Sequence, residues 1–308
     1  MKKTVLVLLA AASLFMTACN SENKEEASSN DTSEIIRPNI GADIVSGEDG
    51  SGALPNYTDV SDAMRVEALA KVSESFDKDS TDEISEGVTV RTLEFGEGKA
   101  YIITADLTKC TLKAATPYDL VPDTTNQSLR GQAEVMERKG YNVLAGIGAN
   151  LTNKATHIPS GIIIKNSETI YNNSVGDDGS MYFGLYSDGG AFACNYEDYC
   201  KIYRNKVSEA VSATHLLVLN GKPQDVPGTV YEEASIRTGA GFSADRRTVC
   251  FVYADGVDVT QLANLLIASG CSVAVNFGYG EELSMLGGDT VYGAEAPIGP
   301  TLMITEMK

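Results

Sequence analysis

The sequence predicts an α+β domain with a mostly antiparallel sheet flanked by helices. Short apolar runs with alternating polarity recur along the chain and are separated by turn residues, and three longer segments have helical spacing. Short turns between strands give antiparallel pairs, whereas parallel strands need long crossover connections. The sequence shows no internal repeat and no glycine-rich phosphate loop.

Residues 1–18 are typical of an export signal. Lys2 and Lys3 precede an apolar run over residues 5–16 that is too short to span a bilayer. Small residues before Cys19 indicate lipoprotein cleavage, after which Cys19 would be lipidated; ordinary cleavage with an unmodified Cys19 is the alternative. We therefore expect an exported lipoprotein, anchored to the membrane and facing outside the cytoplasm.

Residues 19–56 are predicted to be a disordered acidic tether. Between residues 20 and 50 there are eight acidic and two basic side chains, and little apolar surface to offset the ordering entropy. Such a tether lets a domain move on the order of 30 Å from its anchor. The formal charge of the chain is −18, which argues against nucleic acid as a partner because nucleic acid requires a basic surface.

Residues 57–308 are predicted to be one domain that begins with a helix. Helices are expected at residues 59–76, with Ser61 as a cap, at 126–140 and at 259–268. Asn220-Gly221 is the strongest hairpin signal. Strands are expected at 88–95, 100–107, 110–116, 143–147, 162–165, 169–171, 181–186, 191–194, 215–219, 273–277 and 301–305, and the apolar run 249–253 also indicates a strand.

Cysteine usage does not indicate a metal site. Cys194 and Cys200 flank five residues and could form a disulfide outside the cytoplasm; alternatively, the cysteines after Cys19 are small buried hydrophobic residues. No pair of cysteines has zinc-ligand spacing and there are only two histidines, so we expect no metal and no cofactor.

The order of several motifs resembles the phosphodiester glycosidase family. The segment Arg237-Thr238-Gly239-Ala240-Gly241 looks like the family's Arg-Thr-Ala-Ile-Gly motif. Residues 141–153, 159–165, 249–256, 257–280 and 296–304 are similar to its other strands and turns. The resemblance covers about residues 88–308 and implies hydrolysis of the anomeric bond of a sugar-1-phosphodiester.

Several polar positions of the family's motifs are changed in this chain. Gly148 stands where the family has asparagine, Gly278 where it has aspartate and Glu282 where it has serine. Leu151-Thr152 replaces a Phe-Phe pair, and Ala296 replaces an arginine. The scaffold positions are retained, whereas several polar site positions are not.

The resemblance and the chemistry together suggest candidate substrate-binding residues. A phosphate needs a forked cation, for which arginine is better suited than lysine, so Arg237 is the candidate phosphate ligand, with Thr238 and Gly241 beside it. Bracing of a turn is the alternative for Arg237. His157 could donate a proton to the leaving phosphate oxygen, or it could be a loop residue without a role.

Asp255 and Asn276 are the candidate catalytic residues. The sugar develops oxocarbenium character in the transition state and needs a carboxylate nearby. Asp255 precedes Gly256 and could equally belong to a plain turn, while Asn276 ends a strand where side chains often reach a cleft. Glu281 and Glu282 could supply a carboxylate near Gly278 or belong to a solvated acidic loop.

Three functions remain open from the sequence. The protein could be an active phosphodiester glycosidase with a rebuilt site, an inactive diverged domain that binds a glycan or phosphosugar at the cell envelope, or an envelope lipoprotein without a sugar ligand. Arg237 favours the first two functions over the third. Gly148 and Gly278 favour the second over the first.

Overall fold

A computed structural model of the chain describes residues 54–122, 125–149, 159–173, 181–200 and 205–307. All of these belong to one compact unit, residues 37–308. The predicted signal peptide, Cys19, nearly all of the tether and His157 lie outside the described residues. In the part of the chain that is described, no helix is long and apolar enough to cross a membrane.

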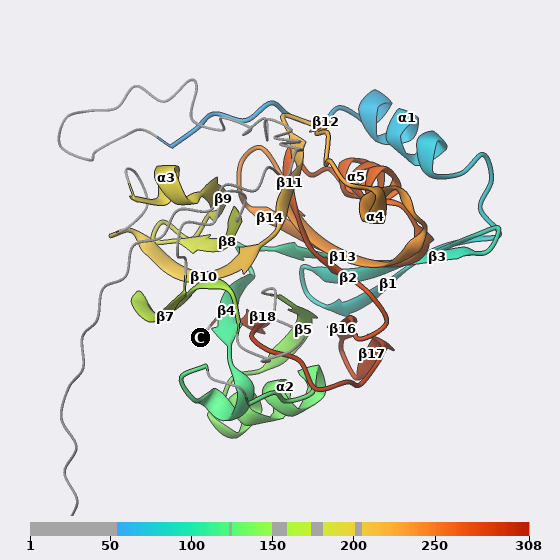
Figure 1. Ribbon diagram of the computed structural model, residues 1–308. Helices are drawn as coiled ribbons and strands as arrows, with labels where there is room; N and C mark the ends of the chain where they lie inside the picture. Colours follow the sequence, from blue (N-terminus) through green and yellow to red (C-terminus); the bar gives the residue numbers. More distant parts are fainter. Residues whose placement is uncertain (1–53, 123–124, 150–158, 174–180, 201–204, 308) are drawn as a thin grey trace, which may run out of the picture. The chain divides into compact units, whose positions relative to one another are not determined.

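The largest sheet has eight strands, and each neighbouring pair in it is antiparallel (Figure 1). In spatial order the strands are β1 (Lys78–Ser85), β2 (Val88–Phe95), β3 (Gly98–Asp106), β14 (Thr248–Val257), β13 (Ser235–Phe242), β15 (Val273–Tyr279), β11 (His215–Leu219) and β12 (Lys222–Pro223). The predicted Asn220-Gly221 turn joins β11 to β12, and both of its residues have positive φ, 52° and 69°.

Two five-stranded antiparallel sheets complete the fold. The second sheet contains β7 (Glu168–Asn173), β6 (Gly161–Lys165), β10 (Val207–Ala213), β8 (Met181–Tyr186) and β9 (Ala191–Asn195). The third contains β17 (Thr290–Gly293), β16 (Ser284–Gly287), β5 (Val143–Gly148), β18 (Thr301–Glu306) and β4 (Cys110–Ala115). The prediction of a mostly antiparallel single domain is confirmed, although helices contribute less than the α+β label implies.

The three predicted helices form, each as long as its prediction or shorter. They are α1 (Asp62–Val72), α2 (Leu129–Arg138) and α5 (Val259–Ala268). The described residues also form short helical segments that were not predicted: α3 (Tyr196–Asp198), α4 (Thr229–Glu232) and a 3₁₀ turn, η1 (Pro117–Asp119). Ser61 caps α1 by accepting a hydrogen bond from the Met64 amide, and Asp258 with Gln261 forms a capping box at α5. These caps satisfy amides that the first helical turn leaves without intrahelical partners.

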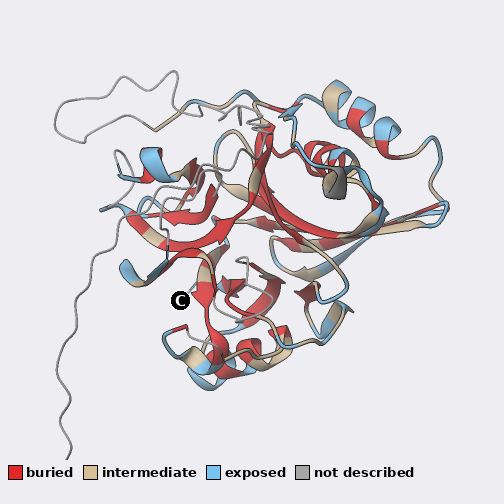
Figure 2. Cartoon of the chain, viewed as in Figure 1, coloured by how far each residue is buried: buried red, intermediate tan, exposed pale blue. Residues whose placement is uncertain are grey.

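The hydrophobic core lies on both faces of the largest sheet (Figure 2). Alternation along β14 is clear: Val252 packs with α1 and α5 on one face, and Phe251 packs with the second and third sheets on the other. Cys194 and Cys200 are both free thiols, so the disulfide considered from their spacing does not form.

Candidate functional site

Arg237 lies near the start of β13 and is fully buried. Its guanidinium donates to the carbonyl oxygens of Val257 (2.9 Å), Glu233 (2.6 Å) and Tyr231 (3.2 Å), and it lies 6.0 Å from the ring centroid of Tyr279. Burial lowers the pKa of Arg237. The side chain therefore joins α4 to the end of β14, and in this conformation a phosphate has no access to it.

Asn276 is buried in β15, opposite Gly239 of β13. Its amide nitrogen donates to the Thr214 hydroxyl (2.7 Å), while its amide oxygen has no hydrogen-bond partner among the described residues. His215 is its partner in β11, and burial lowers the pKa of that imidazole. A buried polar atom without a partner lowers the stability of the folded state by about 1–3 kcal/mol, so the Asn276 amide oxygen destabilises the fold.

Thr238 follows Arg237 and projects from the opposite face of the sheet. It is buried, and its hydroxyl has no hydrogen-bond partner within the described part of the chain. Its neighbours across the sheet are Gly278 in β15 and Tyr253 in β14. Because paired residues project to the same face, Thr238 lies beside the position where the family's motif carries an aspartate.

The two glycines that replace polar family residues meet at the start of β16. A Cβ added to Gly278 would lie 3.3 Å from Leu283 Cδ2, and a Cβ added to Gly148 would lie 3.8 Å from the carbonyl oxygen of Ser284. The Ser284 hydroxyl is buried and has no partner among the residues described. We call this group the strand corner; it consists of Gly148, Thr238, Gly278, Leu283 and Ser284.

Three tyrosines border the strand corner. Tyr101 stacks on Tyr292 with ring centroids 4.1 Å apart, and its centroid is 6.3 Å from that of Tyr253. A Cβ on Gly293 would collide with both the Tyr253 ring and the Leu283 carbonyl oxygen, which places this ring next to the corner. Burial raises the pKa of Tyr253 and of Tyr292, so both hydroxyls remain hydrogen-bond donors at neutral pH.

The candidate carboxylates Asp255, Glu281 and Glu282 lie on the surface of the protein. Asp255 is exposed and pairs with Lys99 in the neighbouring strand β3, and Glu281 and Glu282 are exposed between β15 and β16. After burial, the charge of Asp255 is the next cause of the raised Tyr253 pKa. Across the described ranges, no three His, Cys, Asp or Glu side chains gather closely enough to hold a metal ion.

The structure does not gather Arg237, Asn276 and Asp255 around one cleft. Arg237 and Asn276 are buried on the face of the sheet that α5 covers, whereas Asp255 is exposed at the end of β14. The motif glycines are approached by protein atoms: a Cβ on Gly241 would lie 2.7 Å from Cys271 Sγ, and a Cβ on Gly239 would lie 3.3 Å from Leu266 Cδ1.

Sequence reasoning missed Ser284 and the three tyrosines. Tyr253 belonged to an apolar run and indicated only a strand, and Tyr101 lies in a strand far away along the chain. No motif marks any of the four residues. Their grouping depends on the β3–β14 pairing and on the turn that brings β16 back beside β5.

Comparisons with known proteins place this chain in a family. The family model described as phosphodiester glycosidase matches residues 141–305. The catalytic domain of zebrafish N-acetylglucosamine-1-phosphodiester alpha-N-acetylglucosaminidase, auto-inhibited by its pro-peptide, superposes with a TM-score of 0.57 and 16% identity over 76% of this chain and 82% of that one. A hypothetical protein from Synechocystis superposes with a TM-score of 0.54 and 9% sequence identity, over 75% of this chain and 64% of that one.

A comparison with curated proteins finds no similar sequence. At these identities the two structural matches support the fold, and the family assignment rests on the family model, which spans more than half of the chain. The retained motif order, the three antiparallel sheets and this match agree, and the chain belongs to the phosphodiester glycosidase family.

Proposed function

We propose that the protein hydrolyses the anomeric bond of a sugar-1-phosphodiester at the strand corner. The observation that supports this most is the convergence there of β5, β13 and β15, which carry three of the family-like motifs, around buried hydroxyls of Thr238 and Ser284 that have no partner among the described residues. Buried polar atoms in native structures are nearly always hydrogen-bonded, so exceptions call for an explanation, and a ligand or water is one.

The half-buried rings of Tyr101 and Tyr292 offer an apolar surface beside the corner for a sugar ring. We assign Asp255 to stabilise the positive charge that develops on the sugar in the transition state. It lies two residues after Tyr253 on the same strand, close enough for its charge to raise the Tyr253 pKa. Arg237 has a different part in this proposal. It orders β13 from the α5 side of the sheet, because its Nε and Nη2 groups donate to backbone carbonyl oxygens.

Hydrolysis of a nucleotide-sugar, followed as release of the free sugar, tests the proposal. Asp255→Asn should lower kcat by roughly a hundredfold or more, as loss of an electrostatic partner of the transition state does. Thr238→Val, which keeps the shape and removes the hydroxyl, should lower kcat by about tenfold. The matched control is Asp225→Asn, an exposed carboxylate in the loop after β12. Equal turnover in all four proteins would refute the site.

Binding without turnover is the second candidate function. It is favoured by Leu283, whose methyl group lies where a side chain at position 278 would extend. Calorimetry with the same nucleotide-sugar would then give heat of binding without product. The double variant Gly278→Asp with Leu283→Ala adds a carboxylate at the corner and space for it. Turnover gained only in this variant would identify an inactive descendant of an enzyme.

We also propose that the protein is exported and anchored through a lipid on Cys19. The apolar run and the small residues before Cys19 support this, as in other lipidated cysteine signals. Radiolabelled fatty acid should be incorporated into the wild-type protein, which should fractionate with membranes. Cys19→Ala should lose both properties; a Cys19→Ala protein that still incorporates label would exclude this anchor.

A further inference from the structure

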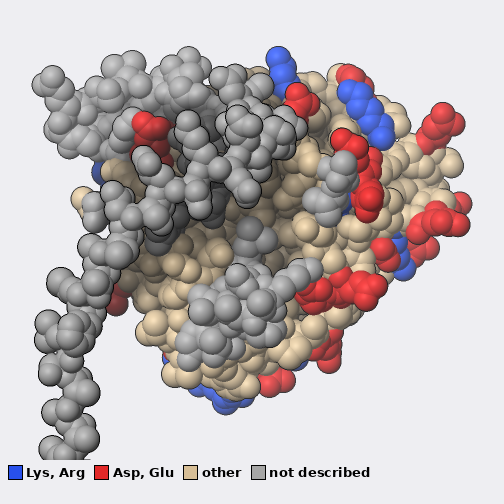
Figure 3. Space-filling view, in the orientation of Figure 1, with Lys and Arg blue, Asp and Glu red and all other residues tan. Residues whose placement is uncertain are grey.

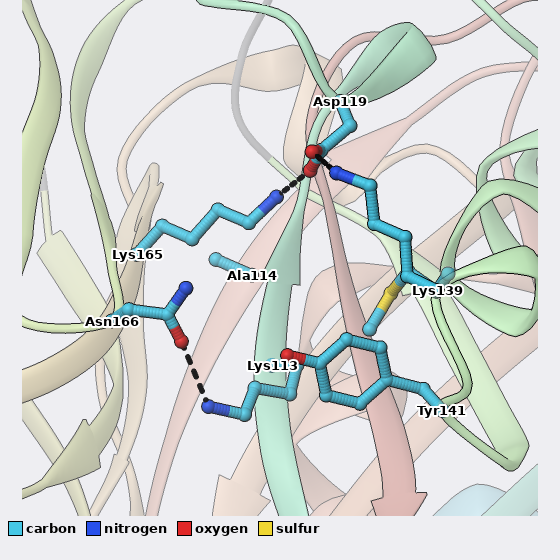
Figure 4. Close-up of a pocket in the computed structure, with 8 residues that line it drawn as sticks. Lys113, Ala114, Asp119, Lys139, Tyr141, Lys165 and Asn166 are labelled. Carbon is cyan, nitrogen blue, oxygen red and sulfur yellow. Dashed lines mark hydrogen bonds and ion pairs between the residues drawn. The ribbon is translucent and has the colours of Figure 1, made fainter.

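A lysine-lined pocket lies outside the strand corner, between β4, β6, the end of α2 and η1 (Figure 4). Its volume is about 100 Å³, which is enough for a small anion or a few water molecules. The polar residues that line it are Lys113, Asp119, Lys139, Tyr141, Lys165 and Asn166. Such a concentration of lysine is unexpected in a chain with a formal charge of −18, and acidic side chains are prominent on the face drawn in Figure 3.

The positive charge of Lys113 is paired with the buried carboxylate of Glu209. Its ammonium group donates to Glu209 Oε1 (2.8 Å) and to the Asn166 side-chain oxygen (3.1 Å). Glu209 is fully buried and also accepts from the backbone amides of Ala114 (3.0 Å) and Asn166 (3.2 Å). Glu209 makes no hydrogen bond to the other two lysines of the pocket, although its charge partly offsets the effect of burial on the Lys165 pKa. Three lysines therefore face two carboxylates in this part of the structure.

Lys139 and Lys165 share one carboxylate. Both ammonium groups contact the Asp119 carboxylate, one at each oxygen, as Figure 4 shows. The side chain of Lys165 is only 20% exposed, and burial lowers its pKa because the ammonium group is partly desolvated. Two cations against one monoanion leave one positive charge in excess, in a partly buried site where charge interactions are stronger than in water.

Asp119 lies in a turn whose backbone conformation is unfavourable. Tyr118 and Asp119 both have left-handed backbone angles, with φ of 53° and 59°, a conformation that costs roughly 1–2 kcal/mol for most residues, such as Tyr118, and less for aspartate. The side chains of Tyr118 and Leu120 are 54% and 58% exposed, so backbone hydrogen bonds, such as that from the Tyr118 amide to the Gln127 side chain (2.7 Å), hold the turn more than these side chains do. The ion pairs with the two lysines offset this cost. Asp119 therefore behaves as a tethered anion in a cationic pocket.

We propose that this pocket binds a phosphoryl dianion, either inorganic phosphate or a phosphate monoester, and that Asp119 is its internal competitor. A monoanion such as acetate would only replace one carboxylate with another and would lose its own translational freedom on binding. A dianion that displaces Asp119 balances the two lysine charges, and it supplies more acceptor oxygens for Lys139, Lys165 and the side-chain nitrogen of Asn166. Lysine is an established partner for phosphate as a point charge. This site does not depend on the proposed hydrolytic function.

Calorimetric titration of the whole folded protein with inorganic phosphate tests the proposal, at about pH 7.5, where phosphate is mostly dianionic, and at constant ionic strength. Asp119→Asn should bind phosphate about tenfold more tightly than the wild type, because the competitor is removed. Lys139→Gln, which changes a half-exposed side chain, should bind about tenfold more weakly. Lys109→Gln, an exposed lysine paired with Glu86, is the matched control and should match the wild type.

A second titration distinguishes the two sources of the dianion and checks the charge requirement. Tighter binding of glucose 6-phosphate than of inorganic phosphate would assign the site to a phosphate monoester, and the reverse would assign it to the free ion. Acetate should give no measurable heat. Unfolding curves confirm that each variant is folded. The proposal is overturned if Asp119→Asn binds phosphate no more tightly than the wild type, or if Lys109→Gln weakens binding as much as Lys139→Gln does.

Discussion

Arg237 is a charged side chain that the fold uses as an internal brace. It has no exposed surface, and its Nε and Nη2 groups donate to carbonyl oxygens of α4, of the residue after α4 and of the end of β14. Removing such a side chain leaves buried acceptors without donors, which costs more than the net value of the bonds themselves. Loss of activity in an Arg237 variant would therefore not by itself indicate a phosphate ligand.

Arg237→Met should lower the free energy of unfolding by roughly 3–4 kcal/mol, because it strips the donors from buried carbonyl oxygens and keeps most of the apolar stem. Urea unfolding measures this. Arg91→Met is the matched control, since Arg91 is partly exposed and pairs with Asp79 (2.6 Å); its loss should cost less than about 1 kcal/mol. Similar values for the two variants would contradict the bracing role.

His215 should make the protein less stable in mild acid. Burial beside Tyr231, at 4.9 Å between ring centroids, lowers the pKa of the folded imidazole below its ordinary value of about 6.5. The unfolded chain then binds the proton more readily, so stability falls as the pH drops through about 6.5 and until the folded pKa is passed. His215→Phe should remove this part of the decline in urea midpoints. An unchanged decline in the variant would show that His215 is not its source.

At the scale of elements, the glycines of β13 stand where α5 and the Cys271 turn pack against the strand. Its glycines allow α5 and the Cys271 turn to approach the sheet closely, so the motif that suggests a ligand-binding loop also has a packing function. Gly278 in the adjacent strand differs, because its backbone does not have positive φ and only the flexible tip of Leu283 is near.

Gly241→Ala should therefore destabilise the protein by roughly 1–3 kcal/mol through overpacking, with Cβ 2.7 Å from both Cys271 Sγ and the Val273 carbonyl oxygen. Gly278→Ala should change stability by less than about 1 kcal/mol, because its nearest contact, at 3.3 Å, can move. Denaturant midpoints at an unchanged m-value compare the two. The reverse order of effects would mean that the sheet relaxes around Gly241.

For the whole molecule, the junction between the second and third sheets depends on one buried carboxylate. Glu209 of β10 accepts from Lys113 and from the Ala114 amide, both in β4, and burial raises the pKa of Glu209. Apolar packing across this junction gives contact without specific orientation. A hydrogen-bonded charge between β10 and β4 favours one arrangement of the two sheets.

Glu209→Ala should lower the free energy of unfolding by roughly 2–4 kcal/mol, because it leaves the Ala114 amide and the Lys113 ammonium without their acceptor. Glu86→Gln, which breaks the exposed pair with Lys109, should have little effect. Thermal unfolding with calorimetry compares these proteins. If Glu209→Ala is as stable as Glu86→Gln, the junction is held by apolar packing alone.

The sequence by itself determined the elements whose signals are local: the Asn220-Gly221 hairpin, the capped helices α1 and α5, and the family, through the order of its motifs. It did not predict β1, whose residues Lys78–Ser85 are polar and largely exposed and which exists as the partner of β2. Only the tertiary structure decided that Arg237 is buried and that Asp119 forms an ion pair with Lys165. Periodicity and turn chemistry act over a few residues, whereas burial and charge partners depend on contacts between strands far apart in the chain.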